Sequence, residues 1–278
     1  MPSYCCPPPP NAHPRLPSNG IPSGSAPARD NTLSTISCAS CRMRDLCLPA
    51  GLSDSECAGF ERLVVRRRLL LRGEILHQMN EPMQDKLYAV HSGQIKCYQV
   101  SYAGEQRITA LPFGGEILGC DAIGSMVHAT SAQANCPSII CEFNYSQLVA
   151  AARNFTPLAR RMELLLSKAL AHQQSVNLML SLPRAEQKLA TFLLQTAWAC
   201  ALRGGDGITF ELGLSRRDIA DYLGLTDATI ARLLQRFIRY GCLAVFRRRF
   251  TLLDAIRLRD IARGDYHTGE ARRAQQAL

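Results

Sequence analysis

The chain has 278 residues, of which 47% are hydrophobic, so it can form two globular domains and a tail. It has no apolar run of about 18 residues, which excludes a membrane-spanning helix, and its net charge of +9 favours a polyanionic partner. The first residues lack the apolar core of a signal peptide, so we expect a cytoplasmic protein. Its 12 cysteines then indicate thiolate chemistry rather than a disulfide framework.

Residues 1–35 are rich in proline and small polar residues and show no hydrophobic periodicity. They contain nine of the chain's 15 prolines. A segment of this composition cannot bury enough apolar surface to fold alone, so we interpret it as a disordered tail. Cys5 and Cys6 lie in this tail, and we do not expect them to form a site.

Three cysteines are closely spaced in the next segment, at Cys38, Cys41 and Cys47. A soft metal ion or an iron–sulfur cluster needs several thiolates that converge on one point, and a short irregular loop can supply three of them. The alternative is that these are three unrelated buried cysteines. A fourth ligand must come from elsewhere, and the candidates are Cys57, Cys97, Cys120, Cys136 and Cys141.

A short helix is expected over residues 53–60, with Ser53 as its N-cap. From residue 63 to residue 143 the pattern changes to short strands, separated by glycine-containing turns that are roughly ten residues apart. This spacing predicts a β-barrel or jelly roll, which with the cysteine segment forms one domain over residues 36–155. In the strand SIICEF, Ile139, Cys141 and Phe143 share one face, so we expect the Cys141 thiol to point inward.

One long helix is expected over residues 156–182, and it carries two stripes of side chains. The first stripe has the alternating spacing of four and three that is typical of a two-stranded coiled coil; its members are Leu166, Leu170, Gln173, Asn177 and Leu180. The second stripe is expected to pack on the barrel; its members are Met162, Leu165, Ala169 and Val176. Because one stripe is enough to pack on a core, the first predicts contact with a second copy in a homodimer.

Residues 183–262 are expected to form a winged helix-turn-helix domain. After a helix over residues 186–202, Ser215 and Asp218 have the spacing of a helix start, and Gly224 marks a tight turn. Small Ala220, then Gly224, then apolar Ile230 is the packing pattern of a helix-turn-helix. Two strands follow, over residues 243–246 and 250–252, and they flank a hairpin tip with three arginines. Residues 263–278 are polar and are expected to be a flexible tail.

The arginines of this domain predict a surface for double-stranded DNA. Residues 203–259 contain 11 arginines and 6 acidic residues, so 11 − 6 gives +5, more than half of the total charge in a fifth of the length. This charge lies along the second helix and the hairpin, where a major-groove helix and its flank need it. The alternative is a helical packing unit with solvated arginines. The candidate DNA-binding residues are Arg216, Arg217, Thr226, Asp227, Ala228, Thr229, Ala231, Arg232, Arg236, Arg247, Arg248 and Arg249.

The sequence shows no Ser/His/Asp or Cys/His arrangement, and its six histidines are scattered, so we do not expect an enzyme.

The order of a cysteine-rich segment, a β-barrel, a long helix and a winged helix-turn-helix resembles the CRP/FNR family of bacterial transcription regulators, over residues 36–255. The cysteine spacing and the stretches GCDAIGS and SAQANCPSIICEF resemble its FNR-type branch in particular.

This resemblance implies an α+β fold in which Cys38, Cys41, Cys47 and Cys141 hold an oxygen-labile [4Fe–4S] cluster. The cluster would assemble under low oxygen and promote the dimer that binds a palindromic operator. The predicted hairpin tip at residues 103–105 is a candidate contact with RNA polymerase. The alternatives are a zinc-stabilised or a thiol–disulfide redox-sensing regulator of the same fold.

Two positions separate this chain from the cyclic-nucleotide branch of the family. That branch binds a phosphate through a glutamate and an arginine, which align here with Cys120 and Thr130. Without the arginine a buried phosphate would lack its charge partner, so no cyclic nucleotide is expected.

FNR-type proteins begin the recognition helix with glutamate, serine and arginine, where this chain has Ala228, Ala231 and Arg232. We therefore predict that each half-site keeps its guanine and is less strict at the base pair that the glutamate reads.

Overall fold

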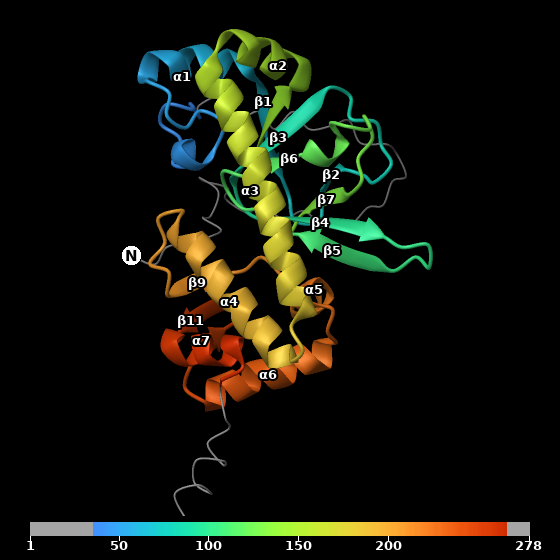
Figure 1. The fold of residues 1–278 in the computed structure, drawn as a ribbon, viewed down its shortest axis with the longest axis vertical. Helices are drawn as coiled ribbons and strands as arrows, with labels where there is room; N and C mark the ends of the chain where they lie inside the picture. The colour runs from blue at the N-terminus through green and yellow to red at the C-terminus, as the bar shows by residue number, and fades with distance from the viewer. Residues whose placement is uncertain (1–35, 266–278) are drawn as a thin grey trace, which may run out of the picture.

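The computed structural model describes residues 36–265 (Figure 1). A β-barrel lies at one end of the molecule, a mainly helical domain lies at the other, and a long helix runs along the barrel toward the helical domain. The predicted tail at 1–35, with Cys5 and Cys6, lies outside the described residues, and so do residues 266–278 of the predicted C-terminal tail. Within residues 36–265, each helix is too short or too polar to cross a membrane.

The cysteine-rich segment folds into short helical turns beside the barrel. It contains the 3-10 turn η1 (Arg44–Leu46), the helix α1 (Asp54–Phe60) and the 3-10 turn η2 (Glu61–Leu63). The predicted N-cap of α1 is confirmed, because the Ser53 hydroxyl accepts the N–H of Glu56, whose carboxylate in turn accepts the N–H of Ser53 at 2.7 Å. The helix buries Cys57 and Phe60 in the core that this segment shares with the barrel.

Two antiparallel four-stranded sheets form the barrel. The first, in the order β1-β8-β3-β6, contains β1 (Val64–Leu70), β8 (Ser138–Asn144), β3 (Lys86–Ser92) and β6 (Ile117–Leu118). The second, in the order β2-β7-β4-β5, contains β2 (Ile75–His77), β7 (Ser131–Ala134), β4 (Ile95–Val100) and β5 (Gln106–Ala110). The predicted strands are present, whereas the short strands β2, β6 and β7 were not predicted because two to four residues are too few to show alternation.

The barrel strand that carries Cys141 is buried on both of its faces. Ile140 faces the barrel interior, where it packs with Leu70 and Val90. Cys141 and Phe143 face the other way, into the core between the barrel and the cysteine-rich segment. The prediction that Cys141 points inward rather than into solvent is confirmed, because its side chain is buried, and the cysteine-rich segment covers it on the outer face of the sheet.

Two helices follow the barrel, α2 (Tyr145–Asn154), which was not predicted, and the predicted long helix α3 (Thr156–Ser181). In the second predicted stripe, Met162 and Leu165 pack on the cysteine-segment core and Val176 is buried against the C-terminal domain. Ala169 does not pack on the barrel, and this part of the prediction is wrong. The reason is that residues 166–175 of α3 are all exposed, although the Gln173 side chain donates to the carbonyl of Thr109 in β5 at 3.4 Å.

The C-terminal domain has the predicted winged helix-turn-helix fold. Its elements are α4 (Ala185–Ala201), β9 (Thr209–Glu211), α5 (Arg216–Leu223), α6 (Asp227–Arg239), β10 (Leu243–Phe246), β11 (Arg249–Leu252) and α7 (Ala255–Arg263). Ser215 caps α5 in a reciprocal pair with Asp218, and Gly224 ends the helix in the left-handed region at φ +64°. Ala220 and Ile230 are buried where α5 meets α6. These observations confirm the α+β fold class, with a β jelly roll, a long helix and a winged helix-turn-helix in that order.

Candidate cysteine cluster and nucleic-acid interface

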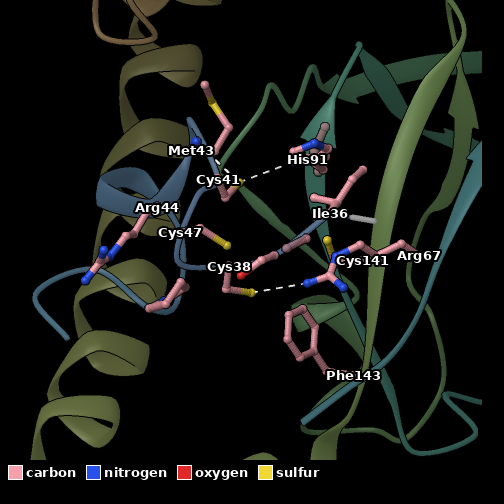
Figure 2. Close-up of a pocket in the computed structure, with 14 residues that line it drawn as sticks. Ile36, Cys38, Cys41, Met43, Arg44, Cys47, Arg67, His91, Cys141 and Phe143 are labelled. Carbon is pink, nitrogen blue, oxygen red and sulfur yellow. Dashed lines mark hydrogen bonds between the residues drawn. The ribbon is translucent and has the colours of Figure 1, made fainter. Parts of the chain in front are cut away.

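One pocket is lined by Cys38, Cys41, Cys47 and Cys141 (Figure 2). The first three come from the loop around η1, and Cys141 comes from the central strand β8 of the facing sheet. The structure thus brings together four thiols from two segments that lie about a hundred residues apart in the sequence. The other cysteines proposed as fourth ligand do not line this pocket; these are Cys57, Cys97, Cys120 and Cys136.

The loop is held against the barrel by a close approach and by hydrogen bonds. A Cβ atom added to Gly115, which has φ +88°, would lie 2.6 Å from the Cβ of Leu46, so a side chain here would push the loop away. Arg161 of α3 donates from Nε to the carbonyl of Cys47 at 2.8 Å and from a terminal nitrogen to that of Asp45 at 3.1 Å. The same loop therefore contacts both the barrel and the long helix.

Arg67 and His91 were not predicted, yet they contact the thiols. Arg67 is buried on β1, where it pairs in register with Cys141, and it donates to the Cys38 sulfur at 3.4 Å. Its charge is balanced by Glu61, whose carboxylate also accepts the N–H of Cys38 at 2.6 Å. His91 Nδ1 lies 3.3 Å from the Cys41 sulfur. No sequence spacing signals these residues, because they reach the thiols through side-chain contacts between segments 29 and 50 residues apart.

Burial controls the protonation of these thiols. It raises the pKa of Cys47 to about 12 and that of Cys141 to about 11, and it also raises the pKa of Cys38 and of Cys41. For Cys141, the charge of Arg67 acts in the opposite direction and lowers the pKa. The free thiols are therefore neutral at pH 7. Binding of a metal group by them would release protons, because the thiolate is the form that binds.

The second candidate site is the exposed face of α6 and its surroundings. Ala228 and Arg232 are exposed, and Ala231 is half-buried. Thr226 caps the helix by accepting the N–H of Thr229 at 3.2 Å, and Asp227 lies in the first turn, where a negative charge is favourable. Figure 1 shows α6 at the far end of the molecule from the cysteine-rich segment and α1.

The predicted arginines differ in how far they are free to reach DNA. Arg216 and Arg217 are exposed in the first turn of α5. Arg236 forms an ion pair with Glu186 of α4, and Arg249 pairs with Glu211 of β9 at 3.2 Å. Arg247 and Arg248 form the turn between β10 and β11, and the Arg247 guanidinium lies 5.4 Å from the Phe246 ring centroid. The free charge of this surface is thus smaller than the count of arginines implies.

The helix-turn-helix is also tied to the barrel. Lys96 of β4 forms an ion pair with Asp218 of α5 at 2.8 Å, and both side chains are largely buried. The Asp221 carboxylate of α5 accepts the N–H of Ile108 in β5 at 2.9 Å. The sequence did not predict these contacts, which join α5 to the β4–β5 hairpin. They give the barrel a direct physical connection to the helix-turn-helix, in addition to α3.

A β-barrel with a thiol-lined pocket, joined by a long helix to a winged helix-turn-helix, defines a sensor-coupled DNA-binding regulator. Two family profiles match this architecture: the cyclic nucleotide-binding domain over residues 67–154 and the Crp-like helix-turn-helix domain over residues 187–261. Among solved structures, FixK2 from Bradyrhizobium japonicum has a TM-score of 0.64 at 27% sequence identity, and the match covers 70% of this chain and 96% of that one.

Curated relatives are similar over most of the chain. The anaerobic regulatory protein of Pasteurella multocida is 33% identical over 227 residues, which cover 82% of this chain and 83% of that protein. The fumarate and nitrate reduction regulatory protein of Escherichia coli is 35% identical over 210 residues, which cover 76% of this chain and 84% of that protein. The chain belongs to the CRP/FNR family of transcription regulators, which are DNA-binding proteins and not enzymes.

Proposed function

We propose that this protein is an oxygen-responsive transcription regulator that binds a [4Fe–4S] cluster through Cys38, Cys41, Cys47 and Cys141. The observation that carries the proposal is the pocket these four thiols line. One relative is named anaerobic regulatory protein, which is in keeping with a response to oxygen. Under low oxygen the loaded protein forms a dimer and binds a palindromic operator in the cytoplasm.

The donor set fits an iron–sulfur cluster better than a single zinc ion. Four thiols are the usual ligands of such a cluster. A tetrahedral zinc site with bonds of about 2.3 Å needs sulfurs about 3.8 Å apart. Among residues 36–265, no three of these four sulfurs lie within 4.8 Å of one another. A larger group with several iron corners suits thiols that surround a pocket without touching. When bound, the cluster supplies oxygen-labile iron–sulfur chemistry.

The protein's own residues connect this pocket to the dimer helix. Arg67 keeps a positive charge beside Cys38 and Cys141, and Glu61 fixes the backbone of Cys38. Arg161 holds the carbonyls of the cysteine loop from α3, so a rearrangement of the loop acts on the helix directly. A packed interface near its stability threshold turns such a local change into assembly or dissociation.

The dimer is proposed to form along the exposed part of α3. Leu166 is 43% exposed and Leu170 is 63% exposed, which is unusual for large apolar side chains on a helix that also buries another face. Gln173 and Asn177 extend the same row, and Leu180 ends it. The row carries no carboxylate, so repulsion between negative charges along it cannot be what separates unloaded subunits.

DNA binding is assigned to α6 and the hairpin β10–β11. In the dimer the two α6 helices enter successive major grooves, which are about 34 Å apart. Arg232 supplies the bidentate contact to guanine, and the hairpin arginines contact phosphates. We assign the contact with RNA polymerase to the turn between β4 and β5, where Tyr102 is fully exposed.

No cyclic nucleotide is proposed as effector. Thr130, which stands where the nucleotide-binding branch has its arginine, donates both its N–H and its hydroxyl to one oxygen of Asp121, at 2.9 Å each. The position that would need a positive charge for a phosphate therefore faces a carboxylate. Negative charge here repels a phosphate, so the match to the cyclic nucleotide-binding domain describes the fold of the barrel.

The test is iron and acid-labile sulfide analysis, with visible absorption, of protein reconstituted without oxygen. We expect a brown chromophore that air bleaches, and its loss in each of the variants Cys38→Ser, Cys41→Ser, Cys47→Ser and Cys141→Ser. The matched controls Cys57→Ser and Cys97→Ser change a buried cysteine outside the pocket and should keep the cluster. A colourless zinc protein, or a cluster that survives in Cys141→Ser, would overturn the proposal.

A further inference from the structure

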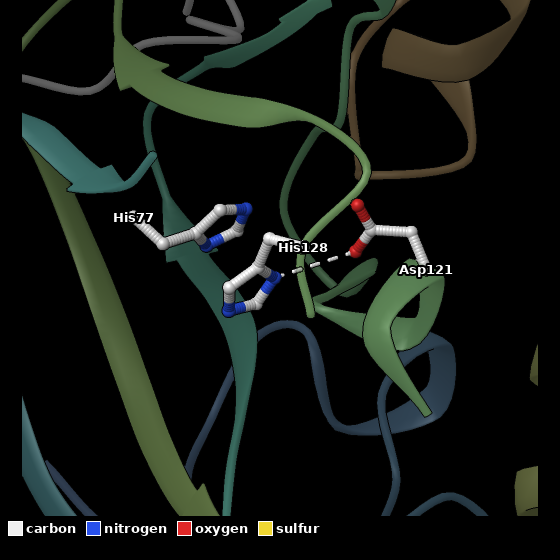
Figure 3. Close-up of side chains that lie close together, drawn as sticks. All are labelled: His77, Asp121 and His128. Atoms are coloured by element: carbon white, nitrogen blue, oxygen red, sulfur yellow. Dashed lines mark ion pairs between the residues drawn. The ribbon is translucent and has the colours of Figure 1, made fainter. Parts of the chain in front are cut away.

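A second group of potential ligands, two buried histidines and one exposed aspartate, lies in the barrel domain, away from the cysteine pocket (Figure 3). It consists of His77 at the end of β2, His128 just before β7 and Asp121 in the 3-10 turn η3 (Cys120–Ala122). Their ligand atoms all lie within 4.8 Å of one another. The three residues are separated by up to about fifty positions in the sequence, so only the fold brings them together.

The two imidazoles are buried without hydrogen bonds. His77 is 5% exposed and His128 is 2% exposed, and their rings stack with centroids 3.8 Å apart. Among the described residues, neither ring nitrogen of His77 nor Nδ1 of His128 has a hydrogen-bond partner. Leaving a buried polar group without a partner costs free energy, and such groups in folded proteins usually have a protein group, a water or an ion as partner.

The third group completes a ligand set. Asp121 Oδ1 lies 3.6 Å from His128 Nδ1, which is too far for a hydrogen bond. The other oxygen, Oδ2, is fixed by the two bonds from Thr130, so the carboxylate is held in place beside the rings. A neutral imidazole has a lone pair that can bind a metal ion.

We propose that His77, His128 and Asp121 form a binding site for one divalent ion of the zinc class. Two imidazoles and one carboxylate suit such an ion and leave a fourth position for water or a small ligand. Because the two rings stack 7° from parallel, binding requires one imidazole to turn about its Cβ–Cγ bond so that both lone pairs face the ion. The site lies beside Thr130, which aligns with the arginine of the nucleotide-binding branch and bonds to Asp121. A bound ion would link β2, η3 and the loop before β7, and its binding does not depend on the cysteine pocket.

The test is calorimetric titration with zinc chloride of a full-length background variant that cannot bind metal through the cysteine pocket, with Cys38, Cys41, Cys47 and Cys141 changed to serine. We expect about one zinc ion per chain, no binding of magnesium, and a higher melting temperature with zinc. Asp121→Asn in this background should weaken zinc binding at least tenfold, because it removes one ligand and keeps the shape. Glu105→Gln, which removes an exposed carboxylate at the β4–β5 turn, is the control and should bind as the background does.

A second measurement covers the case in which the background variant does not fold. Cobalt(II) added to the otherwise unchanged chain without oxygen should give visible bands of nitrogen and oxygen coordination, besides the sulfur-to-cobalt absorption of the cysteine pocket. Asp121→Asn should lose the first set and keep the second. A folded background variant that binds no zinc would overturn the proposal. So would an Asp121→Asn variant with unchanged zinc affinity or an unchanged cobalt spectrum.

Discussion

At the scale of single residues, Arg67 is the main determinant of the charge around the cysteine pocket. It is buried on β1, and it contacts both the Cys38 sulfur and the Glu61 carboxylate. In Arg67→Met, the Glu61 charge would stay beside the thiolates without its partner, which disfavours a negatively charged cluster. Losing a side chain that contacts the metal ligands typically lowers the metal affinity about 10–100-fold.

We expect Arg67→Met to bleach several times faster in air and to retain less iron, while Arg67→Lys recovers part of the difference. Arg62→Met, which removes an exposed arginine next to the pocket segment, is the matched control. The measurement is the rate of loss of visible absorption after mixing with air-saturated buffer. Equal rates for Arg67→Met and Arg62→Met would show that Arg67 has only a structural role.

The second prediction for a single residue concerns Arg232. It is exposed on α6, and the residues at the other two reading positions, Ala228 and Ala231, can offer only methyl contacts. Arg232→Ala should lose about 1–3 kcal/mol of discrimination at one guanine per half-site. Arg239→Ala, in the last turn of α6, should leave this preference intact. The measurement is the affinity for operators substituted one base pair at a time, and a uniform loss over all positions would assign Arg232 to phosphate contact.

At the scale of elements, the hairpin β10–β11 should act through charge alone. Arg247 and Arg248 form its tip, whereas Arg249 is paired with Glu211. Changing Arg247 or Arg248 to glutamine should weaken binding to all sequences alike and reduce the slope of log affinity against log salt by about 0.9 each. Arg249→Gln should reduce it less, because its charge is already balanced. Equal slopes in all three variants would contradict this ordering.

The long helix α3 gives the second prediction for an element. Leu170→Asp would place two carboxylates together in the symmetric interface, at a cost of several kcal/mol. Sedimentation without oxygen should show monomers that keep their iron. Ser175→Asp adds the same charge on the opposite side of the same exposed stretch and should remain a dimer. If Leu170→Asp sediments as a dimer, the interface lies on another face of α3.

At the scale of the whole molecule, the sequence predicts local features such as helix caps and turns, but not contacts between residues far apart in the chain. Ser215, Gly224 and the apolar positions of α6 act on their own turns, so the helix-turn-helix could be predicted residue by residue. Arg67 and His91 reach the loop thiols through side-chain contacts between the barrel and the cysteine-rich segment, and no alternation or spacing encodes these contacts. The burial of Cys141 could be predicted from alternation, but not that the cysteine-rich segment covers it, since β8 is covered on both faces.

The exposed length of α3 shows a further limit of sequence patterns. An apolar stripe has the same sequence pattern whether it packs on the chain's own barrel or on a second copy. The pattern therefore predicts barrel contact for Ala169, which is exposed in the structure. Contacts between domains were also hidden from the sequence. Lys96 and Asp218 are 122 residues apart, yet they tie the barrel to α5, and Arg161 ties the cysteine loop to α3. These two connections are the physical routes by which the pocket can influence DNA binding.

The most direct test of the central claim is sedimentation of one reconstituted sample, with operator DNA present, before and after exposure to air. We expect an iron-loaded dimer on DNA without oxygen, and monomers free of DNA once the visible absorption is lost. Cys141→Ser should behave like the air-exposed sample from the start. A protein that remains dimeric and DNA-bound after losing its iron, or a Cys141→Ser variant that binds the operator as the unchanged chain does, would contradict the account.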